Sequence, residues 1–436
     1  MRRELFRLVG NSSFVFGCRI SGAALTFLTQ VLLARWMGAE QLGVYVLAFS
    51  WFLLISTLSS IGYSEATIRF VGHYLAQSDY GSFHGYVRRG RQITALAGVL
   101  GAGLALLLIM AFRGWIAEDQ VMPLAIAMLC VPFYSYMRLY SSFAHAQSRF
   151  SLAYIPNAVL RPALFLGAVA LAWWAGVGLS ADLAIGAHGA LIVLVAAIQV
   201  VFFYRGATPE LLRNTPKYET KLWFRTSVPL LFITLFTQYF YEISIVLISP
   251  YLTSGEVGVF SVSYRTALLI AFGLFAVNAA MMPSASRLFS EGDIEGLQRL
   301  VTKTTLLKFG PSLCAVAVIA VFGREILSIF GDEFEAGYQA FVILSLAQLL
   351  LSAVGPVDTL MRITGHQDEC LRTFAVALVL SVLLNLILVP VFGILGAAAA
   401  VFIVVAFWSI WLHILVVRYL GIKPSVLTLA SVLANR

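Results

Sequence analysis

The chain has 436 residues, of which 60% are hydrophobic and only 11% are charged. This composition excludes a soluble globular protein, because about a quarter of the residues of such proteins are charged. The formal net charge of +8 does not indicate nucleic-acid binding, because in a membrane protein such an excess is typical of basic loops on the cytoplasmic side. We therefore expect a membrane protein without a nucleic-acid partner.

Apolar runs of about 20 residues recur along the whole chain, and each is long enough to cross about 30 Å of hydrocarbon. They predict an all-α, polytopic membrane protein with twelve transmembrane helices at residues 12–34, 42–62, 91–112, 121–143, 153–176, 184–204, 227–250, 257–282, 303–323, 337–359, 371–391 and 394–417. With the N-terminus inside, 23 of the 29 basic residues fall in inner segments, Arg138 among them, and three fall in outer loops. This bias predicts that both termini lie in the cytoplasm.

An internal repeat divides the chain. Residues 32–51 align with residues 247–266 at a constant offset of 215, with Gly43 and Gly258 identical and several aromatic positions shared. The pattern predicts two six-helix parallel repeats, namely an N-terminal bundle at 1–204, a cytoplasmic linker at 205–226 and a C-terminal bundle at 227–436. The inner connections 64–90 and 283–302 occupy matching places, and we expect a short amphipathic helix against the lipid in each.

The four charged residues deepest inside predicted spans are Arg19, Arg161, Glu242 and Arg265, and a charge at a helix centre costs roughly 3 kcal/mol on insertion scales. Arg19 and Arg161 each lie about eight residues from the cytoplasmic end of a span, so we expect both about 12 Å deep, at one level. Guanidinium groups are well shaped for binding a pyrophosphate. We expect Arg19, Arg161 and Arg265 to bind an anionic substrate and Glu242 to serve as a counter-charge or coupling group.

Structural readings of the same residues remain open. Arg19 and Arg161 could extend to the inner interface, and Pro162 could free carbonyl groups that satisfy Arg161. Glu242 and Arg265 could form only a structural tie between helices. The histidines show no ligand spacing, so we predict neither a metal site nor a cofactor, and no catalytic residue.

Three phrases carry a family resemblance: ARWMGAEQLGVYVLA at 34–48, FGREILSIFGDEFEAGYQAFVILSLAQ at 322–348 and NLILVPVFGILGAAAA at 385–400. With the twelve predicted spans, they resemble the multidrug/oligosaccharidyl-lipid/polysaccharide (MOP) exporter superfamily, and within it the Wzx-type polysaccharide flippases. The resemblance implies a MATE-like fold in the bacterial inner membrane. It also implies a carrier that moves undecaprenyl-pyrophosphate-linked oligosaccharides from the cytoplasmic to the periplasmic leaflet, with membrane lipids, a polysaccharide polymerase and chain-length proteins as partners.

Three functions follow for comparison. The first is this flippase, working by alternating access between the two bundles, with or without a proton or sodium ion for coupling. The second is a cation-coupled small-molecule exporter of the same superfamily, which three intramembrane arginines against one acid disfavour. The third is a polytopic sugar-chain polymerase or ligase, which would need a sizeable outer loop with positioned catalytic groups. The predicted outer loops are short, so we expect no enzyme.

Overall fold

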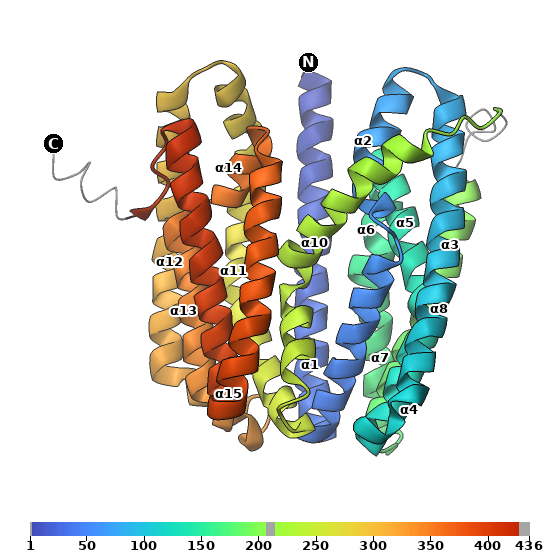
Figure 1. The fold of residues 1–436 in the computed structure, drawn as a ribbon, viewed down its shortest axis with the longest axis vertical. Coiled ribbons are helices and arrows are strands. Elements are labelled where there is room, and N and C mark those ends of the chain that lie inside the picture. Colours follow the sequence, from blue (N-terminus) through green and yellow to red (C-terminus); the bar gives the residue numbers. More distant parts are fainter. Residues whose placement is uncertain (1, 206–213, 427–436) are drawn as a thin grey trace. The chain divides into compact units, whose positions relative to one another are not determined.

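The computed structural model describes residues 2–205 and 214–426, which form helices and turns and contain no strand (Figure 1). Part of the predicted linker at 205–226 falls on residues 206–213, which lie outside the described residues. The chain forms two compact units, residues 1–246 and 247–436. Helix α10 groups by packing with the first unit, and the division of the repeat at 204 and 227 stays a prediction.

The helices of the first unit are α1 (Arg2–Leu58), α2 (Tyr63–Ala76), α3 (Tyr80–Ala111), a 3-10 turn (Arg113–Trp115), α4 (Glu118–Leu129), α5 (Val131–Ala146), α6 (Phe150–Tyr154), a π-helical turn (Ile155–Leu160), α7 (Arg161–Trp174), α8 (Ala181–Arg205) and α10 (Thr220–Ile248). Those of the second unit are α11 (Ser254–Ser290), α12 (Ile294–Ser328), a 3-10 turn (Asp332–Gly337), α13 (Tyr338–Val354), α14 (Val357–Ile363) and α15 (Gln367–Leu420).

The long helices agree with the twelve predicted spans. Eight described helical runs are long and apolar enough to cross a membrane, and the pair α4 and α5, bent by 43°, makes a ninth. Two of the runs break at a glycine with positive φ, Gly38 in α1 (φ 74°) and Gly393 in α15 (φ 57°), so each holds two predicted spans. Helix α11 is the remaining one. The prediction of an all-α polytopic membrane protein is confirmed.

The sequence repeat has a structural counterpart at the chain breaks. Gly38 aligns with Thr253, which caps the N-terminus of α11 in a capping box with Glu256. Asp79 and Asp293, in the two matching inner connections, cap α3 and α12 by accepting a backbone N–H three residues later, at 3.1 Å and 2.7 Å. The repeats therefore break the chain at equivalent places.

The first inner connection contains the expected short helix, but the expected lipid contact there and the helix expected in the second connection were wrong. Helix α2 does not present its apolar face to lipid, because Tyr63, Phe70 and Tyr74 are buried in an aromatic cluster with Tyr86 and Trp223. In the second unit the connection contains no separate helix, since α11 runs to Ser290 and α12 begins at Ile294. Aromatic side chains of α2 gain more from partners on α3 and α10 than from the bilayer surface.

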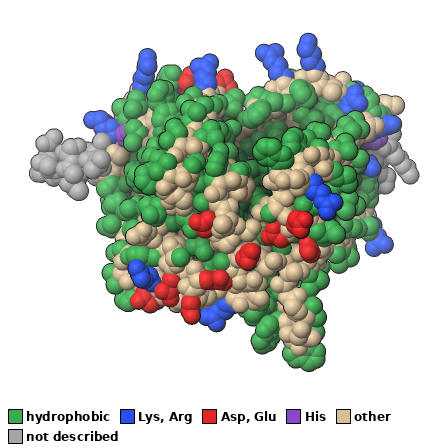
Figure 2. Space-filling view, turned by 60° about the horizontal axis from the view of Figure 1, so that its bottom comes forward, with side chains coloured by type: hydrophobic (Ala, Val, Ile, Leu, Met, Phe, Trp, Pro, Cys, Tyr) green, Lys and Arg blue, Asp and Glu red, His purple; other side chains and the backbone are tan. Residues whose placement is uncertain are grey.

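Acidic side chains gather on the face turned forward in Figure 2, away from the N-terminus of Figure 1. In the sequence, the predicted outer loops contain Glu118, Asp119 and Asp182 in the first unit and Glu256, Asp332, Glu333 and Glu335 in the second. The predicted outer loops contain only three basic residues, Arg35, Arg113 and Arg324, and the positive-inside rule predicts such a scarcity of bases for the outer side. The orientation in the membrane stays a prediction that this charge distribution supports.

Candidate functional site

Among the predicted site residues, Arg161 is the one whose backbone position and side-chain contacts the structure defines most fully. It opens α7 directly after the π-helical turn at 155–160. Pro162 explains that turn, because proline has no N–H for the carbonyl of Ala158 and its ring pushes that carbonyl away. On α1, Gly22 lies against the Ala158 carbonyl, which would be only 2.1 Å from a Cβ at that position. The turn thus fixes both the direction of Arg161 and the approach of α1.

The Arg161 guanidinium binds a histidine rather than a carboxylate. Its Nη1 lies 2.6 Å from Nε2 of His188 on α8, and its Cζ lies 5.8 Å from the centre of the Tyr134 ring on α5. Arg161 Nε is buried without a hydrogen-bond partner, and no carboxylate pairs with Arg161 among the described residues. Its charge is therefore uncompensated within a membrane-spanning helix, an arrangement that favours an anionic ligand.

Aromatic side chains hold His188 in place. Its ring stacks between Phe49 and Phe165, at centroid distances of 4.7 Å and 4.3 Å, and Nδ1 lies 2.9 Å from the Tyr45 hydroxyl. Arginine can only donate, so His188 Nε2 accepts, and the remaining proton of a neutral imidazole is on Nδ1, which donates to Tyr45. The histidine was passed over in the sequence because it has no metal-ligand spacing. Its place inside the predicted span 184–204 was the signal available in the sequence, which does not identify Arg161 as its partner.

Arg19 lies nearer than Arg161 to the N-terminal ends of α1 and of the α6–α7 run. Its guanidinium lies over the Tyr154 ring at 5.8 Å, and one turn further Gly22 lies against Ala158, so α1 and the α6–α7 run are parallel and in register. This register places Arg161 beside Leu25, six residues beyond Arg19, or roughly 9 Å deeper. The prediction of one shared level is wrong, because the two spans begin at different heights. Arg19 is exposed in the described structure.

Glu242 and Arg265 are both half-buried. Glu242 lies on α10, three residues after a break in the helix at Tyr239 (φ −119°, ψ 18°). Arg265 lies on α11. The first belongs to the first unit and the second to the other, so their pairing and their roles stay predictions.

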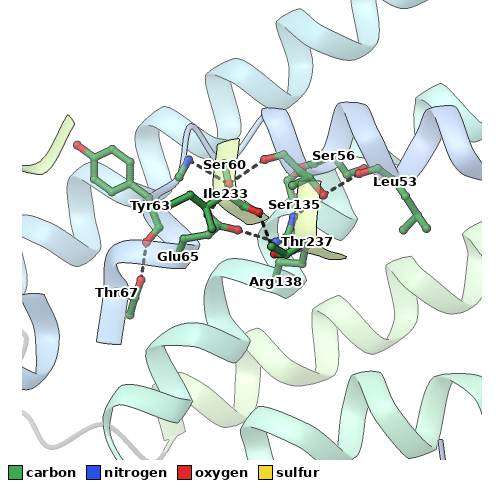
Figure 3. Close-up of polar contacts among 12 residues, drawn as sticks. Leu53, Ser56, Ser60, Tyr63, Glu65, Thr67, Ser135, Arg138, Ile233 and Thr237 are labelled. Carbon is green, nitrogen blue, oxygen red and sulfur yellow. Dashed lines mark hydrogen bonds and ion pairs between the residues drawn. The ribbon is translucent and has the colours of Figure 1, made fainter. Parts of the chain in front are cut away.

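A buried ion pair was missed in the sequence (Figure 3). Arg138 on α5 donates to Glu65 on α2 at 2.7 Å, and the side chains are only 12% and 9% exposed. Arg138 also donates to the Thr57 hydroxyl at 2.5 Å, and its Cζ lies 5.4 Å from the centre of the Tyr239 ring. The sequence analysis counted Arg138 among the inner basic residues and gave it no role in a site, whereas the structure buries it between α5 and α2. Its place inside the predicted span 121–143 was the signal that could have identified it.

Polar groups therefore continue across the first unit. Tyr134 and Arg138 are one turn apart on α5, so the Glu65–Arg138 pair leads through Tyr134 to Arg161 and His188. We name this series of side chains the polar track. It contains a compensated cation at Arg138 and an uncompensated one at Arg161. Only the second has charge left for a ligand.

Comparison with known proteins identifies the family of this chain. Residues 8–289 match the family model described as polysaccharide biosynthesis protein, which covers well over half of the chain. The chain belongs to this family. Residues 229–391 also match the MatE family model.

Relatives of this family member agree with its fold. The chain is 22% identical over 406 residues to the probable low-salt glycan biosynthesis flippase Agl15 of Haloferax volcanii, covering 90% of this chain and 80% of that one. An inward-facing multidrug resistance MATE transporter of the MOP superfamily superposes with a TM-score of 0.79, at 14% identity, over 92% of this chain and 94% of that one. For the lipid II flippase MurJ, inward closed, the TM-score is 0.72, at 13% identity, over 92% and 87%. The family member is therefore a multi-pass membrane protein with the MATE fold, as its sequence predicted.

Proposed function

We propose that this protein is a flippase of the MOP superfamily and that it moves undecaprenyl-pyrophosphate-linked oligosaccharides from the cytoplasmic to the outer leaflet of the cell membrane. The observation that carries the proposal is the guanidinium of Arg161, which lies within a membrane span without a carboxylate partner among the described residues. A pyrophosphate supplies the missing charge, and Arg binds it through charge-assisted hydrogen bonds. The name of the Haloferax relative, a glycan biosynthesis flippase, supports the same class of substrate.

The two arginines of the first unit lie in sequence along the path of such a headgroup. Arg19, exposed and nearer the cytoplasmic helix ends, would meet the pyrophosphate first, and Arg161, roughly 9 Å deeper, would receive it next. Arg265, which belongs to the second unit, would also bind the anion. Glu242 would be the counter-charge of Arg265 in the absence of substrate, and the substrate would replace it. The sugar follows the headgroup, and alternating access of the two units opens the path to the outer side.

The membrane potential supplies a driving force without any coupling ion. Each negative charge moved outward from a negative interior gains about 2.3 kcal/mol per 100 mV. A proton or sodium ion acting through Glu242 is the alternative. Transport that continues in vesicles with a potential but without ion gradients would support the first mechanism, and transport that stops there would support the second.

The proposal is tested in cells that accumulate lipid-linked oligosaccharide. Arg161→Ala and Arg19→Ala should trap the substrate on the cytoplasmic leaflet, where it stays protected from a glycosidase added outside. Arg372→Ala removes an arginine that is 75% exposed and bridges only to Glu369, so it serves as the control and should export normally. Normal export in the Arg19→Ala/Arg161→Ala double variant would refute the assigned site.

Export of cationic small molecules is the second candidate. The match of residues 229–391 to the MatE model favours it, as does the likeness to MATE transporters. The first unit argues against it, because an organic cation would face an uncompensated guanidinium there. Saturable binding of a lipophilic cationic dye to the purified protein would favour this candidate, provided that a pyrophosphate lipid does not displace the dye.

A further inference from the structure

The hydrogen bond between Arg161 and His188 fixes the charge of the imidazole in the structure as it stands. Arg161 Nη1 and His188 Nε2 are 2.6 Å apart, and the guanidinium has no lone pair to offer. Nε2 must therefore be unprotonated. The imidazole is neutral, with its proton on Nδ1 toward the Tyr45 hydroxyl, 2.9 Å away.

The surroundings of His188 oppose a second positive charge while Arg161 is its neighbour. The titratable or charged groups that the packed helices bring to this region include Tyr45 from α1, Cys130 after α4, Tyr134 from α5 and Arg161 from α7. The ring is 93% buried and stacked between phenylalanines, so water screens it poorly. Two adjacent cations there would repel each other strongly.

An anion at Arg161 reverses this balance. When a phosphate oxygen takes the Nη1 hydrogen bond, the Nε2 lone pair of His188 loses its donor. The negative charge of the phosphate then compensates a proton on Nε2, and the imidazolium can donate that proton to the same anion. The stacked phenylalanines keep the ring in place, so no rotamer change is needed.

We propose that His188 takes up one proton when a phosphate group binds Arg161, and that the two side chains then hold the anion together. The inference rests on the proposed function, because it assumes an anionic substrate at Arg161. Linkage requires that anion binding and protonation strengthen each other by the same factor. Anion affinity must rise as the pH falls, by up to about tenfold per pH unit for one linked proton. The net charge of the complex would then be one unit more positive than the sum of the charges of the free protein and the free headgroup.

The test uses the full-length protein in lipid nanodiscs and a short-chain polyprenyl diphospho-sugar. This probe is a diphosphate diester, which lacks the phosphate monoester group that titrates near pH 6. Calorimetry in two buffers with different ionisation enthalpies should show uptake of about one proton on binding at pH 7.5. The affinity should rise severalfold or more between pH 8 and pH 6.

Two variants separate the possible origins of this proton. His188→Gln keeps an amide that accepts from Arg161 and donates to Tyr45, and it should bind the probe without proton uptake and with an affinity independent of pH. His84→Gln removes a histidine at the surface of α3, bonded to the Asn214 carbonyl at 2.7 Å, and should behave as the wild type. Because proton uptake is measured directly on the wild type, the result does not depend on the folding of a variant.

The outcomes distinguish the inference from the proposed function. If the wild type does not bind the probe, or Arg161→Ala binds it equally well, the proposed anion site is wrong and the inference falls with it. If binding depends on Arg161 but no proton is taken up and the affinity does not change with pH, only the role of His188 is refuted. Proton uptake that persists in His188→Gln would refute it as well.

Discussion

The guanidinium of Arg138 and the carboxylate of Glu65 form an ion pair at 2.7 Å inside the first unit, between helices α5 and α2. The two residues are 73 positions apart in the chain, and both side chains are almost fully buried. An intact buried ion pair adds little net stability, because desolvation offsets the attraction between the charges. The loss of one partner is costly, because it leaves the other as an uncompensated buried charge. The pair therefore fixes how α2 sits on α5.

Neutralising Glu65 should destabilise the protein more than neutralising Arg138. Glu65→Gln leaves a guanidinium that cannot lose its proton, whereas Arg138→Met leaves a carboxyl that can take one up. We expect a cost of about 3–5 kcal/mol for Glu65→Gln and less for Arg138→Met, with the double variant regaining part of the loss. Unfolding in mixed micelles of increasing denaturing detergent measures the three values.

The matched control for this prediction is Glu369→Gln. Its partner Arg372 is 75% exposed, so the variant should change the free energy of unfolding by no more than about 1 kcal/mol. A larger loss in Arg138→Met than in Glu65→Gln would contradict the account of this pair.

Gly22→Ala should separate α1 from the π-helical turn before Arg161. A Cβ at Gly22 would lie 2.1 Å from the Ala158 carbonyl oxygen, so the backbones must move apart. We expect a loss of about 1–3 kcal/mol in stability. Gly17→Ala, on the same helix with nothing within 4 Å of the added Cβ, should be neutral or slightly stabilising. Equal thermal stability of the two variants would show that the close approach is unimportant.

Asp79 should stabilise α3 over the whole physiological pH range. Hydrogen bonds from the Ser82 backbone N–H and then from the Ser82 hydroxyl hold the pKa of the Asp79 carboxyl below its usual value, with Lys217 adding to the effect. Because the folded pKa is lowered, the stabilisation is present above the unfolded pKa of about 3.9 and is lost as the pH falls through the folded value. Loss of the cap in Asp79→Ala should cost about 1 kcal/mol.

The measurement for Asp79 is the stability difference between wild type and Asp79→Ala as a function of pH. It should be equal at pH 8 and pH 6 and should shrink only below about pH 4. Asp293→Ala removes the equivalent cap in the second unit and provides the comparison. A difference that already varies between pH 8 and pH 6 would mean that another group is titrating.

The features that the sequence predicted well depend on neighbouring residues along the chain. Apolar runs of about 20 residues define the spans. The structure breaks the two longest helices at Gly38 and Gly393, between predicted spans, where glycine adopts the backbone angles easily. The repeat at 32–51 and 247–266 was likewise visible from local spacing, and the equivalent caps at Asp79 and Asp293 agree with it.

The features that the sequence did not predict depend on contacts between distant segments. Nothing near Arg138 in the chain identifies Glu65 as its partner, and nothing near Arg161 identifies His188, 27 positions away on another helix. The depth of Arg19 was misjudged because it depends on the register between α1 and α6, which follows from packing against Tyr154.

The most direct test of the central claim measures transbilayer movement of a polyprenyl diphospho-oligosaccharide in proteoliposomes that contain the purified protein. The account predicts rapid movement with the wild type and with Arg372→Ala, and a rate at least about tenfold lower with Arg161→Ala, the factor expected when a charge-assisted hydrogen bond of 1.5–3 kcal/mol is lost. An undiminished rate in Arg161→Ala, with the protein folded and inserted, would contradict it.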